Sequence, residues 1–171
     1  ILYIANPNNP TGESVPRETN VTLLDRLDCL VVVDECYFEF HGETVIDLLP
    51  RYEHLFVMRS FSKAFGLAGL RIGYGLGTSE LCDYLMRTAQ AYSVNRLAQA
   101  AAIAALDDLD FAHKRIAEVK HDREWMRGEL ETLGFKVHAS ATNFLLVNTR
   151  GTGKTATQLA SELRERGIFI A

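Results

Sequence analysis

The chain has 171 residues, a formal net charge of −4 and 47% hydrophobic residues, which is the composition of an ordinary globular protein. This charge offers no basic surface to nucleic acid or acidic membranes, and the apolar runs are too short to span a bilayer, so neither partner is expected. Cys29, Cys36 and Cys82 lack metal-ligand spacing, as do the scattered histidines, so no metal site is expected. We interpret the cysteines as reduced core thiols of a cytoplasmic protein.

Short apolar runs stand at both ends of the chain, at residues 1–5 and 167–171, and each predicts a strand. Each strand would start or stop at the chain end without a cap or a turn. We therefore expect the chain to be a piece of a longer protein.

A cluster of proline, asparagine and glycine follows the first predicted strand, in the sequence N-P-N-N-P-T-G. Pro7 and Pro10 restrict the residues before them to extended backbone, so Asn6 and Asn9 should be held rigidly. These residues alone are compatible with either a plain turn or a binding loop.

The run C-L-V-V-V at residues 29–33 predicts a parallel strand covered on both faces, because it is apolar without alternation. The strand delivers Asp34, Glu35 and Tyr37 at its carboxyl end, where ligands bind in open α/β sheets. Two acids and a tyrosine at this position favour a site over a helix cap or a solvated surface.

The stretch V-M-R-S-F-S-K-A-F-G-L-A-G-L-R-I-G-Y, residues 57–74, contains Ser60, Ser62, Lys63 and Arg71. Its single lysine stands among small and apolar residues, which predicts a partly desolvated amine able to attack carbonyl carbons. An ordinary exposed lysine on a turn is the alternative.

The predicted elements alternate along the first part of the chain, with strands at 1–5, 29–33, 55–58 and 71–76 and a helix within 16–28. This alternation indicates an α/β fold with a mostly parallel sheet and flanking helices. Further helices are predicted at 80–90, 96–107, 111–133 and 155–166, and short strands at 135–138 and 143–147. We expect a larger domain at residues 1–110, followed by a connecting helix and a smaller, incomplete α+β domain at 111–171.

The helix predicted at 111–133 should turn one apolar face inward, made of Ile116, Val119, Met126, Leu130 and Leu133. The sequence G-T-G-K-T at 151–155 resembles a phosphate-binding loop but lacks the first glycine of that motif, where Asn148 stands. We therefore expect a polar turn followed by a helix cap.

The motifs N-P-N-N-P-T-G, D-E-C-Y and S-F-S-K-A-F-G-L-A-G-L-R-I-G-Y, in this order and spacing, resemble those of fold-type-I pyridoxal-phosphate enzymes, specifically the class I and II aminotransferases. The sequences Y-S-V-N-R-L-A-Q-A-A-A-I-A-A-L at 92–106 and A-T-N-F-L-L-V at 141–147 further resemble the histidinol-phosphate aminotransferase branch. The resemblance covers nearly the whole chain.

The resemblance implies that Lys63 binds the aldehyde of pyridoxal 5'-phosphate as a Schiff base and later moves a proton as the catalytic base. It implies that Asp34 pairs with the ring nitrogen and that Asn9 and Tyr37 hydrogen-bond the phenolic oxygen of the ring. Glu35 suits the first role less well, because its longer side chain would reach too far if the end of the strand lies close to the ring. The same resemblance assigns the cofactor phosphate to Ser60, Ser62 and Arg71.

The implied activity is transamination between an amino acid or amino phosphate ester, such as histidinol phosphate, and a 2-oxo acid, in a homodimer. Asn148 departs from the basic residue expected after the A-T-N-F-L-L-V strand. The family pattern also implies that the N-terminal half of the large domain precedes Ile1 and that the arginine for the substrate carboxylate follows Ala171.

Three alternatives stay open. The chain could come from a threonine-phosphate decarboxylase, which keeps the same cofactor residues. It could instead be the aminotransferase-like effector module of a transcription regulator. Taken alone, the 171-residue piece could also be inert.

Overall fold

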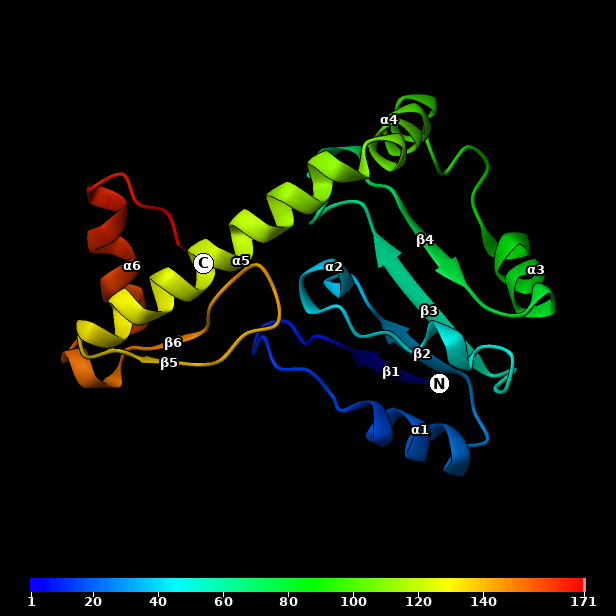
Figure 1. The fold of residues 1–171 in the computed structure, drawn as a ribbon, viewed down its shortest axis with the longest axis horizontal. Helices are drawn as coiled ribbons and strands as arrows, with labels where there is room; N and C mark the ends of the chain where they lie inside the picture. Colours follow the sequence, from blue (N-terminus) through cyan, green and yellow to red (C-terminus); the bar gives the residue numbers. More distant parts are fainter. Residues whose placement is uncertain (171) are drawn as a thin grey trace.

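The computed structural model describes residues 1–170, which form a four-stranded sheet with helices around it and a smaller two-stranded unit beyond a long helix (Figure 1). The strands of the main sheet stand in the order β1 (Leu2–Ala5), β2 (Val31–Asp34), β3 (Leu55–Ser60) and β4 (Gly73–Leu76). The first three are parallel, and β4 returns antiparallel to β3. The expected α/β fold with a mostly parallel sheet is confirmed.

The helices of this first part are α1 (Arg17–Arg26), the short α2 (Phe38–His41), α3 (Ser79–Thr88) and α4 (Arg96–Asp107). The sequence pattern predicted all of them except α2, which is a single turn directly after Tyr37. Gly42 ends α2 in the left-handed conformation, which glycine adopts without strain.

The main core lies on one face of the sheet, where Val31, Val33, Leu55 and Val57 are almost completely buried against Leu24 of α1. The opposite face is covered less, since Val32 and Phe56 are only half-buried. The expectation of strands buried on both faces is therefore wrong for residues 1–170, because α1 and the segment around Leu48 pack on one face alone.

A buried ion pair joins the carboxyl ends of β2 and β3. The guanidinium of Arg59 donates two hydrogen bonds to Glu35 Oε2, at 3.0 and 2.8 Å, while the backbone N–H of Val45 donates to Glu35 Oε1 at 2.8 Å. Thr44 donates its hydroxyl to the same carboxylate, and Arg59 lies 3.6 Å above the Phe38 ring. Glu35 is 1% exposed, so these donors together compensate its burial.

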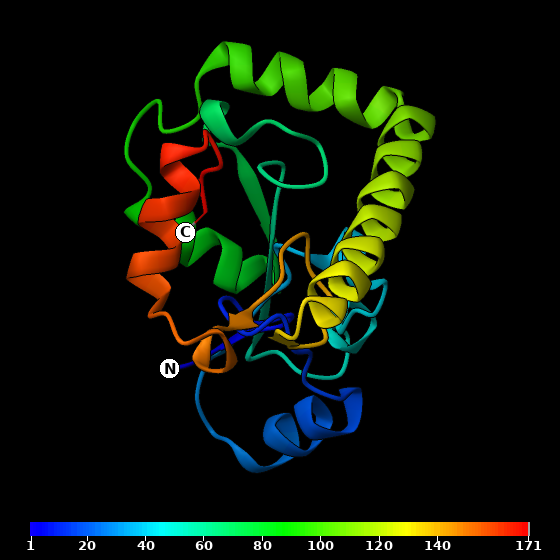
Figure 2. The same cartoon turned by 90° about the vertical axis from the view of Figure 1, so that its left-hand side faces the viewer.

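The long helix α5 (Leu109–Thr132) leaves α4 at a corner and runs to the smaller unit (Figure 2). Ile116 is buried against Tyr37 and Phe40, but Met126 and Leu133 are 49% and 72% exposed. The expected inward face is therefore wrong at Met126 and Leu133, whereas Leu130 is half-buried. In this second half, α5 packs against the narrow strand β5, and Arg123 donates to the Thr142 carbonyl.

The smaller unit pairs β5 (Lys136–Val137) antiparallel with β6 (Val147–Asn148) and continues into α6 (Ala156–Glu165). Thr155 caps α6: its hydroxyl accepts from the Gln158 N–H, and the Gln158 side chain accepts from the Thr155 N–H. The expected helix cap is confirmed. The strand expected at 167–171 is not formed by residues 167–170, and Ala171 lies outside the described residues.

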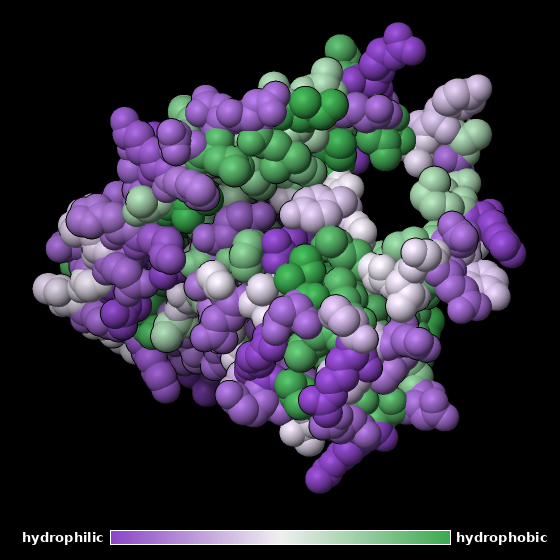
Figure 3. Space-filling view, turned by 45° about the vertical axis from the view of Figure 1, so that its right-hand side comes forward, coloured by the Kyte–Doolittle hydropathy of each residue, from purple (hydrophilic) through white to green (hydrophobic). Residues whose placement is uncertain are grey.

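Hydrophobic side chains remain exposed along α4, among them Leu97, Ile103 and Leu106. Figure 3 shows hydrophobic surface in the upper part of the molecule, interrupted by hydrophilic side chains. None of the helices within residues 1–170 is both long enough and apolar enough to cross a membrane.

Replacing Arg59 by alanine should lower the free energy of unfolding by about 3–5 kcal/mol, because Glu35 would stay buried without its main partner. Arg51→Ala is the matched control, since Arg51 pairs with Asp25 in an exposed bridge, and we expect a loss of about 1 kcal/mol or less. Denaturant unfolding measures both values. Equal losses in the two variants would contradict this account of the ion pair.

Candidate active site

The candidate site residues lie at the carboxyl edge of the three parallel strands. Asp34, the last residue of β2, is paired with Ala5 of β1 and with Met58 of β3. The loops that carry Asn9, Tyr37 and Lys63 therefore leave the sheet at the same edge.

Tyr37 is the centre of the cluster. Its hydroxyl accepts a hydrogen bond of 2.9 Å from Asn9 Nδ2, and Lys63 Nζ lies 5.6 Å from the centroid of its ring. The ring is 7% exposed and packs edge-on against Phe144, with 5.5 Å between centroids. Asn9, Tyr37 and Lys63, which are distant in the sequence, are thus brought together.

The Asp34 carboxylate is held by two donors. The backbone N–H of Cys36 donates to Oδ1 at 3.0 Å, and the hydroxyl of Tyr3 donates to Oδ2. Glu35, by contrast, is fully engaged in the buried ion pair. Burial, together with the neighbouring Asp34, raises the pKa of the Cys36 thiol to about 12, so this thiol stays protonated and unreactive.

Lys63 follows β3 in a loop that β4 closes, since the Phe61 N–H donates to the Ile72 carbonyl at 3.2 Å. The side chain of Lys63 is exposed, so the expected desolvation of its amine is wrong for the described residues. The physical reason is its place in an open loop at the sheet edge, where the Tyr37 ring covers one side only.

The expected phosphate-binding residues are only partly assembled. Ser60 and Ser62 lie side by side, and the Ser62 N–H donates to Ser60 Oγ at 3.0 Å. The loop returns Arg71 toward the end of β3, but its exposed guanidinium donates to the carbonyl of Ala68 at 2.9 Å and is not joined to the serines. Arg71 has a positive φ of 54°, which is uncommon outside glycine.

The smaller unit contacts the candidate site through the loop that carries Ala141 and Phe144, a contact that the sequence did not predict. The Ala141 N–H donates to the Gly12 carbonyl at 2.8 Å, next to the point where Phe144 packs on Tyr37. Gly12 has φ +78°, and a Cβ there would lie 2.5 Å from Ser140 Oγ. The signal was present in the A-T-N-F motif at 141–144, which we used only for its resemblance.

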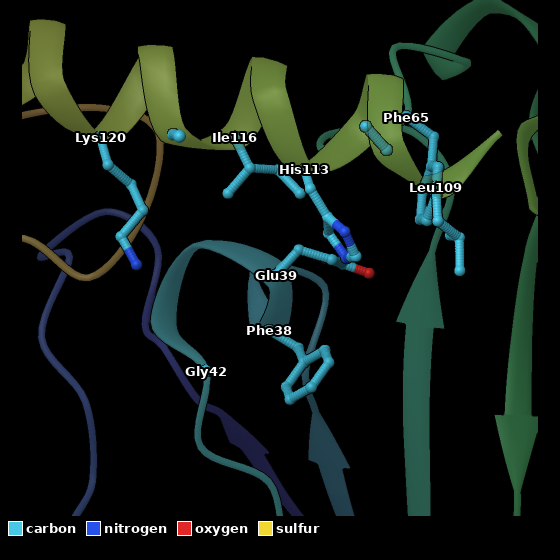
Figure 4. Close-up of a pocket in the computed structure, with 10 residues that line it drawn as sticks. Phe38, Glu39, Gly42, Phe65, Leu109, His113, Ile116 and Lys120 are labelled. Atoms are coloured by element: carbon cyan, nitrogen blue, oxygen red, sulfur yellow. The ribbon is translucent and has the colours of Figure 1, made fainter.

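A cavity of about 350 Å³ lies between α2, Phe65 and the first half of α5, and none of the candidate site residues lines it (Figure 4). Glu39 points into it beside His113, and Glu39 Oε2 is buried without a hydrogen-bond partner. Burial raises the pKa of the Glu39 carboxyl. Within residues 1–170, no group of three or more His, Cys, Asp or Glu side chains could hold a metal ion.

A family model described as aminotransferase class I and II matches residues 1–171. A histidinol-phosphate aminotransferase of Methanothermobacter thermautotrophicus is 41% identical over 171 residues, which are 99% of this chain and 46% of the relative. The chain thus spans about half the length of the curated relatives it matches.

Two solved structures are similar in fold as well as in sequence. A histidinol-phosphate aminotransferase of Sinorhizobium meliloti, in complex with pyridoxal-5'-phosphate, matches with a TM-score of 0.91 and 33% identity over 98% of this chain and 47% of its own. An L-threonine-O-3-phosphate decarboxylase of Porphyromonas gingivalis matches with a TM-score of 0.85 and 31% identity over 98% and 53%.

Gly12→Ala should destabilise the protein more than Gly153→Ala. Both glycines have a similar positive φ, for which alanine costs about 1 kcal/mol, but a Cβ at Gly153 meets nothing within 4 Å. The contact with Ser140 should add about 1–3 kcal/mol at Gly12. In a double-mutant cycle measured by unfolding, Ser140→Gly should recover part of that loss; strictly additive effects would refute the contact.

Glu39→Gln should raise the melting temperature at pH 8, and the gain should shrink toward pH 4. A carboxyl whose pKa is raised in the folded state favours folding fully only below its unfolded pKa of about 4.3 and loses that contribution as the pH rises through the folded pKa. Melting curves at several pH values measure the effect, and Glu53→Gln, at an exposed position, is the control. A lower melting temperature for Glu39→Gln at pH 8 would count against it.

Proposed function

The chain belongs to the aminotransferase class I and II family, and on this premise we propose that the full-length protein is a pyridoxal-phosphate-dependent aminotransferase. The observation that carries the proposal is the meeting of Asn9, Tyr37 and Lys63 at the edge of the sheet where Asp34 ends β2. The similarity to histidinol-phosphate aminotransferases supports it.

The chemistry of the donor set fits this cofactor. An exposed primary amine at Lys63 is available to its aldehyde, and a carboxylate at Asp34 suits a protonated ring nitrogen. The amide of Asn9 and the phenol of Tyr37, already joined at 2.9 Å, suit its phenolic oxygen. Ser60, Ser62 and Arg71 are the candidates for its phosphate, and in this structure the guanidinium of Arg71 donates to the Ala68 carbonyl.

Pyridoxal phosphate, when bound, supplies an electron sink for negative charge that develops on the substrate. The residues of the chain supply the rest. Lys63 Nζ would hold the cofactor, and as a free amine it would accept the proton from the α-carbon of the substrate. Asp34 holds the proton on the ring nitrogen by its opposite charge, and Asn9 and Tyr37 orient the ring by hydrogen bonds.

We propose an amino acid or amino phosphate ester of the histidinol-phosphate kind as amino donor and a 2-oxo acid as acceptor. Asn148 stands where we expected a basic residue, and its side chain accepts from the Arg150 N–H at 2.9 Å. A homodimer in the cytoplasm belongs to the same proposal.

Threonine-phosphate decarboxylation is the second candidate, favoured by the similarity to the Porphyromonas gingivalis decarboxylase. A screen of amino donors with the full-length protein separates the two activities. Transamination converts the cofactor to its amine form with a change in absorbance, whereas decarboxylation releases carbon dioxide. If no donor caused either the change in absorbance or the release of carbon dioxide, both proposed activities would be contradicted.

Lys63→Ala in the full-length protein should abolish the absorbance of the bound cofactor near the edge of the visible range, because it removes the amine that lies 5.6 Å from the centroid of the Tyr37 ring. Absorption spectra of the purified proteins measure this. Lys154→Ala, which removes an exposed amine paired with Glu162 in the smaller unit, should keep the wild-type spectrum. An unchanged spectrum in Lys63→Ala would sink the assignment of this lysine.

A further inference from the structure

We propose that Tyr3 is a positioning residue for Asp34: it fixes the carboxylate in the orientation in which this group faces the ring nitrogen of the cofactor. The inference rests on the proposed function and adds a residue that neither the motifs nor the family resemblance pointed to. Tyr3 lies in the middle of β1 and contains no atom that the proposed chemistry uses directly.

The strand register brings Tyr3 to Asp34. Tyr3 of β1 is paired with Val32 of β2, and Asp34 lies two residues further along β2. Residues two apart in a strand point to the same face, and a diagonal neighbour is within reach of a tyrosine side chain. The phenol of Tyr3 accordingly extends along the sheet and donates its hydrogen bond to Asp34 Oδ2.

Two donors bind different oxygens of the Asp34 carboxylate. The backbone N–H of Cys36 holds Oδ1 at 3.0 Å, and the hydroxyl of Tyr3 holds Oδ2. One donor would leave the carboxylate free to rotate about the bond to its β-carbon, whereas two donors on different oxygens fix its plane. Each oxygen keeps a lone pair for a further donor, so the carboxylate can still receive the ring nitrogen.

Tyr3 is suited to remain a donor. Burial, the hydrogen bond to Asp34 and the charge of Asp34 all raise the pKa of its phenol above the ordinary value, so the proton stays on Tyr3 at neutral pH. The side chain is 54% exposed, so a phenylalanine can replace it without strain and removes only the hydroxyl.

A role in packing alone is the competing explanation. In strand β1, Leu2 and Ile4 pack against the main core, whereas Tyr3 is on the opposite face. Packing would be satisfied equally by phenylalanine, since the ring is retained. Only the hydrogen bond distinguishes the two side chains, so the Tyr3→Phe variant tests the positioning role directly.

The experiment compares the full-length wild type with Tyr3→Phe and measures the dissociation constant of pyridoxal phosphate by equilibrium dialysis of cofactor-depleted protein. We expect roughly a three- to tenfold weaker binding, the effect of losing about one hydrogen bond. With a donor found in the screen, kcat should fall by a similar factor while KM changes less than about twofold. The melting temperature of the cofactor-free protein should stay unchanged.

Tyr84→Phe is the matched control, since Tyr84 lies on α3 and is 55% exposed. Its dissociation constant should equal that of the wild type. Equal cofactor binding and kcat in Tyr3→Phe and wild type would overturn the inference and leave the proposed function standing. If the wild type itself bound no pyridoxal phosphate, the proposed function would fall and the inference with it.

Discussion

The buried ion pair between Glu35 and Arg59 is the interaction on which the geometry of the candidate site depends. Glu35 directly follows Asp34, and Arg59 directly precedes Ser60, so the pair locks the ends of β2 and β3 at the point where the polar side chains emerge. Two charges in a buried position allow little movement, because separating them would leave each charge buried without its main partner. The loops beyond can therefore be open and exposed while their starting points stay fixed.

The sheet and most helices could be predicted because their signals are local. A buried strand is indicated by an unbroken apolar run, as at residues 29–33, and the start of a helix by a capping residue, as at Thr155. Both signals depend only on residues close in the sequence. Each of Asn9, Tyr37 and Lys63 follows a predicted strand, and the structure places the three side chains together, since parallel strands end at a common edge. The roles given to these residues stay predictions.

What the sequence could not predict depends on contacts between distant segments. The exposure of Lys63 follows from how little of the chain covers its loop, and no local pattern records that. Met126 fits the helical spacing of the apolar residues in α5, but it is exposed. This spacing indicates which face of a helix is apolar and does not indicate whether another segment packs on that face. The sequence shows Tyr3 only as one residue of an apolar strand. Its hydrogen bond to Asp34 depends on the register between β1 and β2, which the sequence does not reveal.

The contact between Gly12 and Ala141 has a consequence for the order in which the molecule assembles. It joins the asparagine loop to a segment that is far from it in the sequence and that a ribosome makes much later. Contacts of such long sequence separation carry the largest loop-closure cost and form after local structure. During synthesis all four strands of the sheet are made before Phe144, so the contact between Phe144 and Tyr37 is among the last parts of the candidate site to form.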